Sequence, residues 1–316
     1  LIIRHPNMTV TPSTSSEDMK RVLGGFYKLN NGVIMPRIGL GTAYNEDQGK
    51  INGAVRAAFE NGYRLIDTAA NYKNEDMIGK ALKDAVPSSG LSREDIFLTT
   101  KVGVCNEDSV AHVGRTIDNA LKALGSSYLD LVLIHYPRDR FTGTDDDESN
   151  AHSRRLTWQA LEDIYEKDKV IRAIGVSNYE VYHLAELFEY ARVVPAVNQC
   201  EYHPFATQKL LRHYCKLKGI TFQAFSSLAW GNAELMAAPV LQQLADKYGV
   251  SKQNILFAFG LASDAGILPK SESPSRVRTN IVDTLKVNLT EEEVKALSEL
   301  NRNQVFCPTC EMHKVI

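Results

Sequence analysis

Short apolar segments alternate with longer amphipathic segments along most of this chain. Each short segment has the length of a buried strand and ends on a polar or small residue. The longer segments repeat apolar residues at spacings of three and four, as one face of a helix requires. Eight strands with helices between them favour an α/β fold, the (β/α)8 or TIM barrel of parallel strands. The expected strands span residues 36–40, 64–67, 96–101, 129–135, 171–176, 196–199, 221–225 and 267–270.

The segment ahead of these strands carries a turn signal. Asn31-Gly32 separates two short alternating runs, which predicts a β-hairpin that closes the bottom of the barrel. Residues 1–24 are polar and aperiodic, so we expect a mobile N-terminal tail before a single domain over residues 25–316. A doubly wound sheet is the alternative, but Tyr44 stands where its Gly-rich turn needs a third glycine. Helices are expected over residues 54–61, 110–124, 184–192 and 209–218 and from residue 290 onward.

Charge and composition narrow the class of partner. The net charge of −2 argues against a protein that binds nucleic acid or an anionic membrane, since both need a basic surface. No apolar run approaches the roughly 20 residues that cross a bilayer. Five scattered cysteines do not form a disulfide framework and suggest a reducing compartment, so a cytoplasmic location is expected. No heptad seam calls for an oligomer, and a monomer is expected.

Reactive side chains end three successive strands. Asp67, Lys101 and His135 take these places, where barrel enzymes carry their active sites, and Tyr72 follows Asp67 closely. The Lys101 ammonium should favour the phenolate and lower the pKa of Tyr72. Asp67 can hold that ammonium, while His135 can donate a hydrogen bond to a carbonyl oxygen. A general acid beside a polarised carbonyl is what reduction by hydride needs. The alternative, charges buried only for stability, is disfavoured because such burial rarely stabilises.

A basic cluster follows the last strand. Lys270, Ser271, Arg276 and Asn280 lie near an expected helix start, and this set suits a phosphate dianion held by charge-assisted hydrogen bonds. A phosphate site here favours NADPH over NADH, whose ribose lacks the 2′-phosphate. A solvated basic turn is the alternative, and Glu272 beside the cluster is expected to weaken phosphate binding.

Longer motifs carry a family resemblance. Residues 62–72 (GYRLIDTAANY), 174–179 (IGVSNY) and 268–271 (LPKS) resemble, in order, three signatures of the aldo-keto reductases. Residues 91–101 and 195–199 are also similar to that family. The resemblance covers roughly residues 26–308, and it implies a barrel that binds NADPH without a Rossmann fold and reduces aldehydes or ketones to alcohols.

By position, the resemblance also implies roles. Tyr72 would be the proton donor, Asp67 and Lys101 would tune it, and His135 would orient the carbonyl. His135 and Tyr136 would contact a small carbonyl substrate. No metal is implied. The implied cofactor-binding residues are Thr42, Asp67, Ser177, Asn178, Gln199, Phe225, Ser226, Leu228, Lys270, Ser271, Arg276 and Asn280.

The substrate pocket departs from the pattern of the family. Relatives often carry tryptophan where this chain has Ala43, Gly103 and Tyr136, so we expect a wider mouth. Trp230 can either swing into that mouth or pack, and Trp158 is expected to pack. The missing aromatics leave open an alternative function, a cofactor-binding regulatory or partner subunit with little turnover.

Three other features are expected to have no catalytic or ligand-binding role. The acidic loop 138–155 is expected to be a solvated face, and His203 to be structural. Cys307 and Cys310 have Cys-x-x-Cys spacing without further ligands nearby, so they are expected to be free thiols rather than a zinc site.

Overall fold

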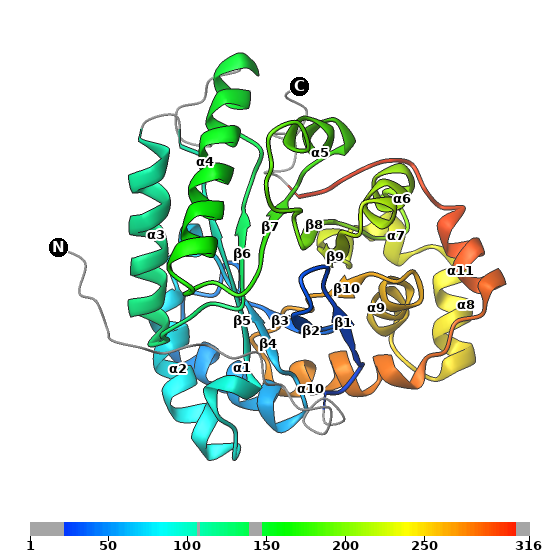
Figure 1. The fold of residues 1–316 in the computed structure, drawn as a ribbon. Helices are drawn as coiled ribbons and strands as arrows, with labels where there is room; N and C mark the ends of the chain where they lie inside the picture. The colour runs from blue at the N-terminus through cyan, green and yellow to red at the C-terminus, as the bar shows by residue number, and fades with distance from the viewer. Residues whose placement is uncertain (1–21, 106–107, 139–146, 308–316) are drawn as a thin grey trace.

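The computed structural model describes residues 22–105, 108–138 and 147–307, and eight parallel strands form its centre (Figure 1). Neighbouring strands pair in chain order from β3 to β10. Parallel bridges between Ile38 and Ile267 and between Gly41 and Lys270 join the first strand region to the last. The (β/α)8 barrel is therefore confirmed. Its strands are β3 (Gly39–Gly41), β4 (Leu65–Asp67), β5 (Phe97–Val102), β6 (Leu131–Ile134), β7 (Ile174–Ser177), β8 (Val197–Glu201), β9 (Thr221–Phe225) and β10 (Gly266–Ile267).

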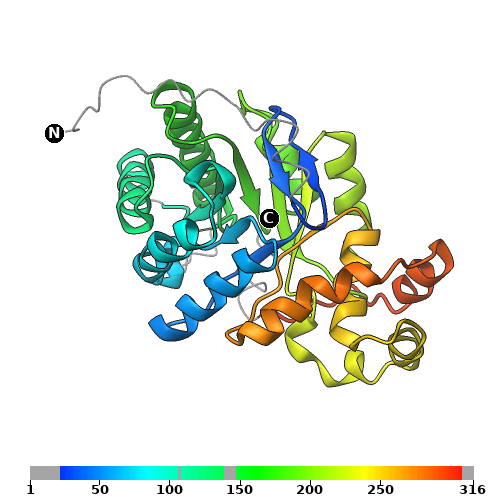
Figure 2. The ribbon, with the colours of Figure 1, turned by 90° about the horizontal axis from the view of Figure 1, so that it is seen from below.

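A β-hairpin covers the N-terminal end of the barrel, as predicted. Strands β1 (Phe26–Lys28) and β2 (Ile34–Pro36) pair antiparallel, and Gly32 takes the positive φ of 88° that the turn requires. Leu29 and Met35 are buried in one cluster with residues from the lower parts of the strands. Figure 2, seen from below, shows the blue hairpin lying across this end. Pro36 pairs within the hairpin, so the first barrel strand begins later than the expected residue 36.

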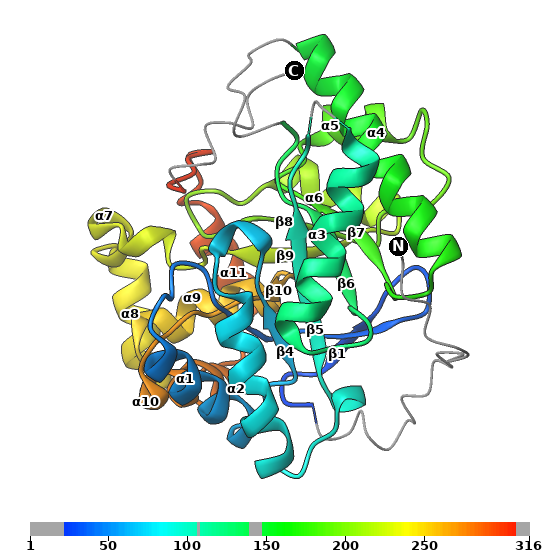
Figure 3. The same cartoon turned by 90° about the vertical axis from the view of Figure 1, so that its left-hand side faces the viewer.

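Helices surround the sheet, and α2, α3 and α4 lie side by side along one flank (Figure 3). The helices α2 and α3 approach closely, because a Cβ on Gly79 would lie 2.0 Å from the Ala123 carbonyl oxygen. Among the described residues, no helix has the length and apolar character needed to span a membrane. The α-helices are α1 (Gln48–Glu60), α2 (Glu75–Ser88), α3 (Ser109–Leu124), α4 (Asp147–Lys167), α5 (Val181–Leu187), α6 (Lys209–Leu217), α7 (Ala233–Met236), α8 (Pro239–Tyr248), α9 (Lys252–Ala262), α10 (Pro274–Val282) and α11 (Glu291–Ser298).

Several expected boundaries are wrong, and the expected helix 54–61, for example, begins at Gln48. The segment 138–155 was expected to be one loop, yet α4 begins at Asp147. Its first turn is entirely polar and gives no apolar periodicity, although acidic residues suit a helix N-terminus. The expected helix 184–192 begins earlier, after Glu180, whose side chain takes part in a capping box, and it ends at Leu187. Residues 139–146 of the acidic loop lie outside the described residues.

Candidate active site

The barrel brings the four expected catalytic side chains to one end. Asp67 is the last residue of β4, Lys101 lies on β5, and His135 follows β6 directly. These three strands are neighbours in a parallel sheet, so their C-terminal ends meet. Tyr72 ends a short 3-10 helix, η2 (Ala70–Tyr72), in the loop after β4. The side chains that the sequence singled out therefore share one site.

Lys101 links Asp67 to Tyr72. Its Nζ donates hydrogen bonds to Asp67 Oδ1 at 2.6 Å, to the Thr68 carbonyl oxygen at 3.0 Å and to the Tyr72 hydroxyl at 3.4 Å. Both members of the ion pair are almost fully buried. The ammonium uses its three donors on these three oxygens, which fixes its position beside the phenol.

The second oxygen of Asp67 is also engaged. Gln199 Nε2 donates to Asp67 Oδ2 at 2.8 Å and to Gln223 Oε1 at 2.8 Å. Gln223 lies on β9, is buried inside the barrel, and was not among the expected site residues. Nothing in its local sequence distinguishes it, because only the closed barrel brings β9 close to β4.

His135 is held by its neighbours on both sides. Its ring stacks on Tyr136 with centroids 4.4 Å apart and an interplanar angle of 11°. Its ring also meets the Tyr72 ring edge-on, with centroids 5.6 Å apart. Its carbonyl oxygen accepts a hydrogen bond from Asn178 Nδ2 at 2.9 Å. The imidazole therefore lies beside the phenol, where both can reach one carbonyl oxygen.

The pKa of Tyr72 differs from the expectation. Burial raises the pKa of Tyr72 well above 10.0, and the negative charge of Asp67 adds to this rise. Burial also lowers the pKa of Lys101, while the charges of Asp67 and Glu75 oppose that change. The expected lowering of the Tyr72 pKa is therefore wrong, because burial of the phenol raises its pKa and the charge of Asp67 raises it further. Tyr72 consequently keeps its proton at neutral pH, which is the state that a proton donor requires.

Three residues expected near a nicotinamide amide also come together. Ser177 Oγ donates to the Gln199 carbonyl oxygen at 2.8 Å, and the Asn178 backbone N–H donates to the same oxygen at 2.9 Å. Asn178 Nδ2 lies 3.0 Å from Ser177 Oγ. Asn178 has a φ of 65°, a conformation that asparagine tolerates better than most residues. The ends of β7 and β8 thus present a compact set of amide and hydroxyl groups.

The remaining expected cofactor residues flank this set. Thr42 follows β3, and its hydroxyl and backbone N–H both donate to the Asp67 carbonyl oxygen, at 2.8 and 3.1 Å. Phe225 ends β9, and Phe225, Ser226 and Leu228 are each half-buried. An accessible aromatic side chain thus lies at the carboxyl end of the barrel.

The basic cluster gathers at the start of α10. Arg276 Nε donates to Ser271 Oγ at 3.2 Å, and the exposed Lys270 side chain lies just before them. Asn280 lies one turn beyond Arg276 on the same helix. Glu272 lies among these groups and pairs with Lys50 of α1 at 2.8 Å. Lys50 was not among the expected site residues.

These positions can be compared with known proteins. The family model described as "Aldo/keto reductase family" matches residues 37–302. The chain belongs to the aldo/keto reductase family. This aldo/keto reductase is 40% identical over 283 residues to the glyoxal reductase of Bacillus subtilis, covering 89% of this chain and 94% of that one.

A second relative and a solved structure agree with this membership. The D-galacturonate reductase of Hypocrea jecorina is 35% identical to the aldo/keto reductase over 288 residues, covering 88% of this chain and 90% of that one. A Bombyx mori aldo-keto reductase, solved in complex with NADP, is similar with a TM-score of 0.82 and 30% identity. That match covers 93% of this chain and 98% of the other. The resemblance drawn from the motifs is confirmed.

The mouth of this aldo/keto reductase holds two aromatic side chains. Trp230, in η4 (Ala229–Gly231), is half-exposed, and its ring lies 5.8 Å from the Tyr44 ring. The Tyr44 ring lies 6.5 Å from the Tyr72 ring. Trp230 therefore lies at the rim of the site, whereas Trp158 is buried in α4 and packs as predicted. Tyr44 was not among the expected substrate-binding residues.

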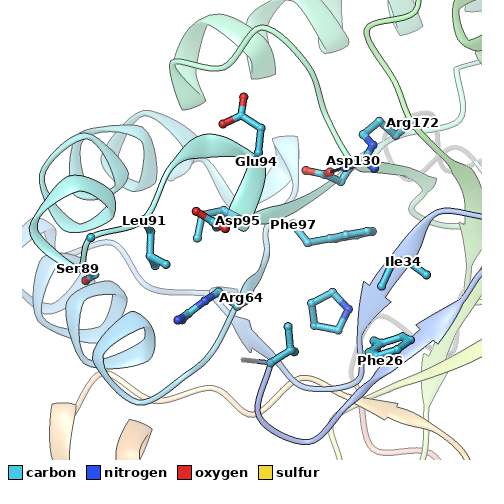
Figure 4. Close-up of a pocket in the computed structure, with 14 residues that line it drawn as sticks. Phe26, Ile34, Arg64, Ser89, Leu91, Glu94, Asp95, Phe97, Asp130 and Arg172 are labelled. Atoms are coloured by element: carbon cyan, nitrogen blue, oxygen red, sulfur yellow. Dashed lines mark hydrogen bonds and ion pairs between the residues drawn. The ribbon is translucent and has the colours of Figure 1, made fainter. Parts of the chain in front are cut away.

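A separate cavity of about 190 Å³ lies at the opposite, N-terminal end of the barrel (Figure 4). Phe26 and Ile34 of the hairpin line one side of it. Asp130 in its wall already accepts from Arg172 at 2.9 Å and from the neighbouring Arg93 at 2.7 Å. This end of the reductase barrel is therefore interpreted as structural.

The C-terminal segment of the described chain is anchored by one carboxylate. Glu201 accepts the backbone N–H groups of Phe306 and Cys307, both at 2.8 Å. His203 is buried, and its Nε2 lies 2.9 Å from Glu201 Oε1, which agrees with the expected structural role. Cys307 is buried, and Cys310 lies outside the described residues.

Proposed function

We propose that this chain is an NADPH-dependent oxidoreductase that reduces aldehydes or ketones to alcohols. The observation that carries the proposal is the contact of the Tyr72 hydroxyl with Lys101 Nζ at 3.4 Å, with the His135 ring alongside. In this mechanism, Tyr72 gives its proton to the carbonyl oxygen of a small substrate. Lys101 stabilises the phenolate that remains, Asp67 holds Lys101, and His135 fixes the oxygen by a hydrogen bond.

The chain offers donors that fit the cofactor. When bound, the reduced nicotinamide supplies the hydride. Ser177, Asn178 and Gln199 would hold its carboxamide, and Phe225 would stack on the ring. Thr42, Ser226 and Leu228 would line the path toward the ribose and diphosphate. NADP in the Bombyx mori relative supports this assignment.

The adenosine end would lie at the basic cluster. Lys270 and Arg276 supply positive charge there, Ser271 supplies a hydroxyl, and the N-terminus of α10 faces the same way. This set suits the 2′-phosphate, and Asn280 would lie near the base. His135 and Tyr136 would contact the substrate. A monomeric state and a cytoplasmic location stay predictions of the sequence.

The proposal is tested by following NADPH oxidation with an aromatic aldehyde, an aliphatic aldehyde, a sugar and a steroid ketone. Turnover of any of these carbonyls, lost in Tyr72→Phe, is expected. Tight binding of NADPH without turnover of any carbonyl would instead favour the binding or regulatory subunit. That subunit should then form a stable complex with a partner on gel filtration.

A further inference from the structure

Glu272 places a negative charge inside the cluster that would receive the 2′-phosphate. Its Oε1 lies 4.0 Å from Lys270 Nζ, and Ser271 is its neighbour in the chain. A carboxylate at such a distance competes with a phosphate dianion for the ammonium and repels the dianion directly. In dinucleotide sites, a carboxylate at the ribose instead favours the unphosphorylated 2′-hydroxyl of NADH. The cluster therefore contains cations that favour NADPH and a carboxylate that favours NADH.

Lys50 of α1 forms an ion pair with the Glu272 carboxylate. Its Nζ donates to Glu272 Oε2 at 2.8 Å, and the interaction lowers the pKa of Glu272, so the carboxylate stays ionised and paired. The packing of α1 against α10 places Lys50 near Glu272. Gly53, one turn further along α1, faces Pro274 at the start of α10, where an added Cβ would lie 3.4 Å from Pro274 Cγ.

The ion pair changes the charge that a phosphate meets. With Lys50 present, its ammonium balances the negative charge of Glu272. The positive charges of Lys270 and Arg276 then remain available to a phosphate. Without Lys50, Glu272 would turn to Lys270, whose Nζ lies 4.0 Å from its Oε1, and would withdraw this ammonium from the ligand. A ribose with a free 2′-hydroxyl would lose nothing by this exchange.

We propose that Lys50 determines cofactor specificity: by holding Glu272, it makes the cluster selective for NADPH over NADH. The inference rests on the proposed function, in which Lys270, Ser271 and Arg276 receive the 2′-phosphate. It adds Lys50 of α1, a residue that lies outside the phosphate motif, as a binding determinant that acts through Glu272.

The test is a double-mutant cycle read as dissociation constants for NADPH and NADH by calorimetric titration. Lys50→Ala should weaken NADPH binding by about fivefold, the range of an exposed ion pair, and leave NADH binding unchanged or slightly tighter. Glu272→Gln should tighten NADPH binding. In the Glu272→Gln background, Lys50→Ala should have little further effect, since no carboxylate remains to be neutralised.

Two controls separate this mechanism from others. Lys80→Ala removes another exposed lysine paired with a carboxylate, Asp76 of α2 at 3.4 Å, and should leave both constants unchanged. If Lys50→Ala weakened NADPH binding by the same factor in the Glu272→Gln background as in the unmodified protein, the inference would be overturned, because Lys50 would then act without Glu272. Equal losses of affinity for NADPH and NADH in Lys50→Ala would also overturn the inference.

Failure of the proposed function gives a different pattern. In that case the unmodified protein would bind neither cofactor, or Arg276→Ala would weaken NADPH and NADH alike. If Arg276→Ala weakened the binding of NADPH but not of NADH, and Lys50→Ala did not, the proposed function would stand and the role of Lys50 would be rejected.

Discussion

The Lys101 ammonium lies 2.6 Å from the Asp67 carboxylate in the interior of the barrel, with side chains only 1% and 5% exposed. Two charges removed from water in this way depend on each other, because a lone charge at this depth has little solvent to stabilise it. The same pair sets the electrostatics of Tyr72. Stability and chemistry therefore rest on one contact.

Lys101→Met is expected to lower the free energy of unfolding by about 3–5 kcal/mol, because it leaves the Asp67 carboxylate buried with only Gln199 as its side-chain donor. Asp67→Asn/Lys101→Met should lose less than the sum of the two single changes, since no unpaired charge remains. Urea denaturation of the four proteins measures this. Additive losses would contradict the mutual dependence. Lys80→Met, which breaks an exposed pair, should change stability little.

Tyr72→Phe removes one oxygen and leaves the ring in place. If Tyr72 supplies the proton, turnover should fall by about 10²–10⁴-fold while the dissociation constant for NADPH stays the same. Steady-state rates and calorimetric titration give the two quantities. Tyr44→Phe is the matched control, because it removes the same oxygen from a ring 6.5 Å from the Tyr72 ring and the proposed mechanism gives Tyr44 no proton to transfer. A Tyr72→Phe protein of near-normal rate would reject the assignment.

The pH profile of reduction should be set by Lys101 on its alkaline side. Burial lowers the pKa of Lys101 below 10.5 and raises the pKa of Tyr72 well above 10.0, so Lys101 loses its proton first as the pH rises. The rate should be flat through neutral pH and fall when the ammonium is lost. Lys101→Arg keeps a charge at all accessible pH values, so the alkaline limb should move upward. A limb at the same pH in Lys101→Arg would assign it to another group.

The meeting of the candidate catalytic side chains at one end of the barrel could be predicted because it depends mainly on topology. Asp67, Lys101 and His135 lie at the carboxyl ends of consecutive parallel strands, so the barrel places them side by side. The pKa of Tyr72 could not be predicted in the same way. It depends on how deeply the phenol is buried and on the distance of Lys101 from Asp67, which only the tertiary structure determines.

Ion pairs between residues far apart in the chain, and helices that begin with a polar turn, could not be predicted from the sequence either. Lys50 and Glu272 are 222 residues apart, and each looks like an ordinary surface charge until α1 packs against α10. Gln223 lies in a strand whose interior face becomes visible only when the barrel closes. The start of α4 was missed because its first turn is polar, so no apolar repeat marks it.

Arg276→Ala provides the sharpest test of the phosphate site. Charge-assisted hydrogen bonds to a phosphate typically contribute enough that removing the guanidinium should weaken NADPH binding by at least about tenfold. NADH has no 2′-phosphate, so its dissociation constant should change little. Arg278→Ala is the matched control, because it removes an exposed arginine two positions further along α10, which points to another side of the helix. Added salt should reduce the difference between the two cofactors in the unmodified protein and have a smaller effect in Arg276→Ala. If both arginine variants weakened the two cofactors equally, the cluster would be a general cationic surface, and the preference for NADPH would have to come from elsewhere in the barrel.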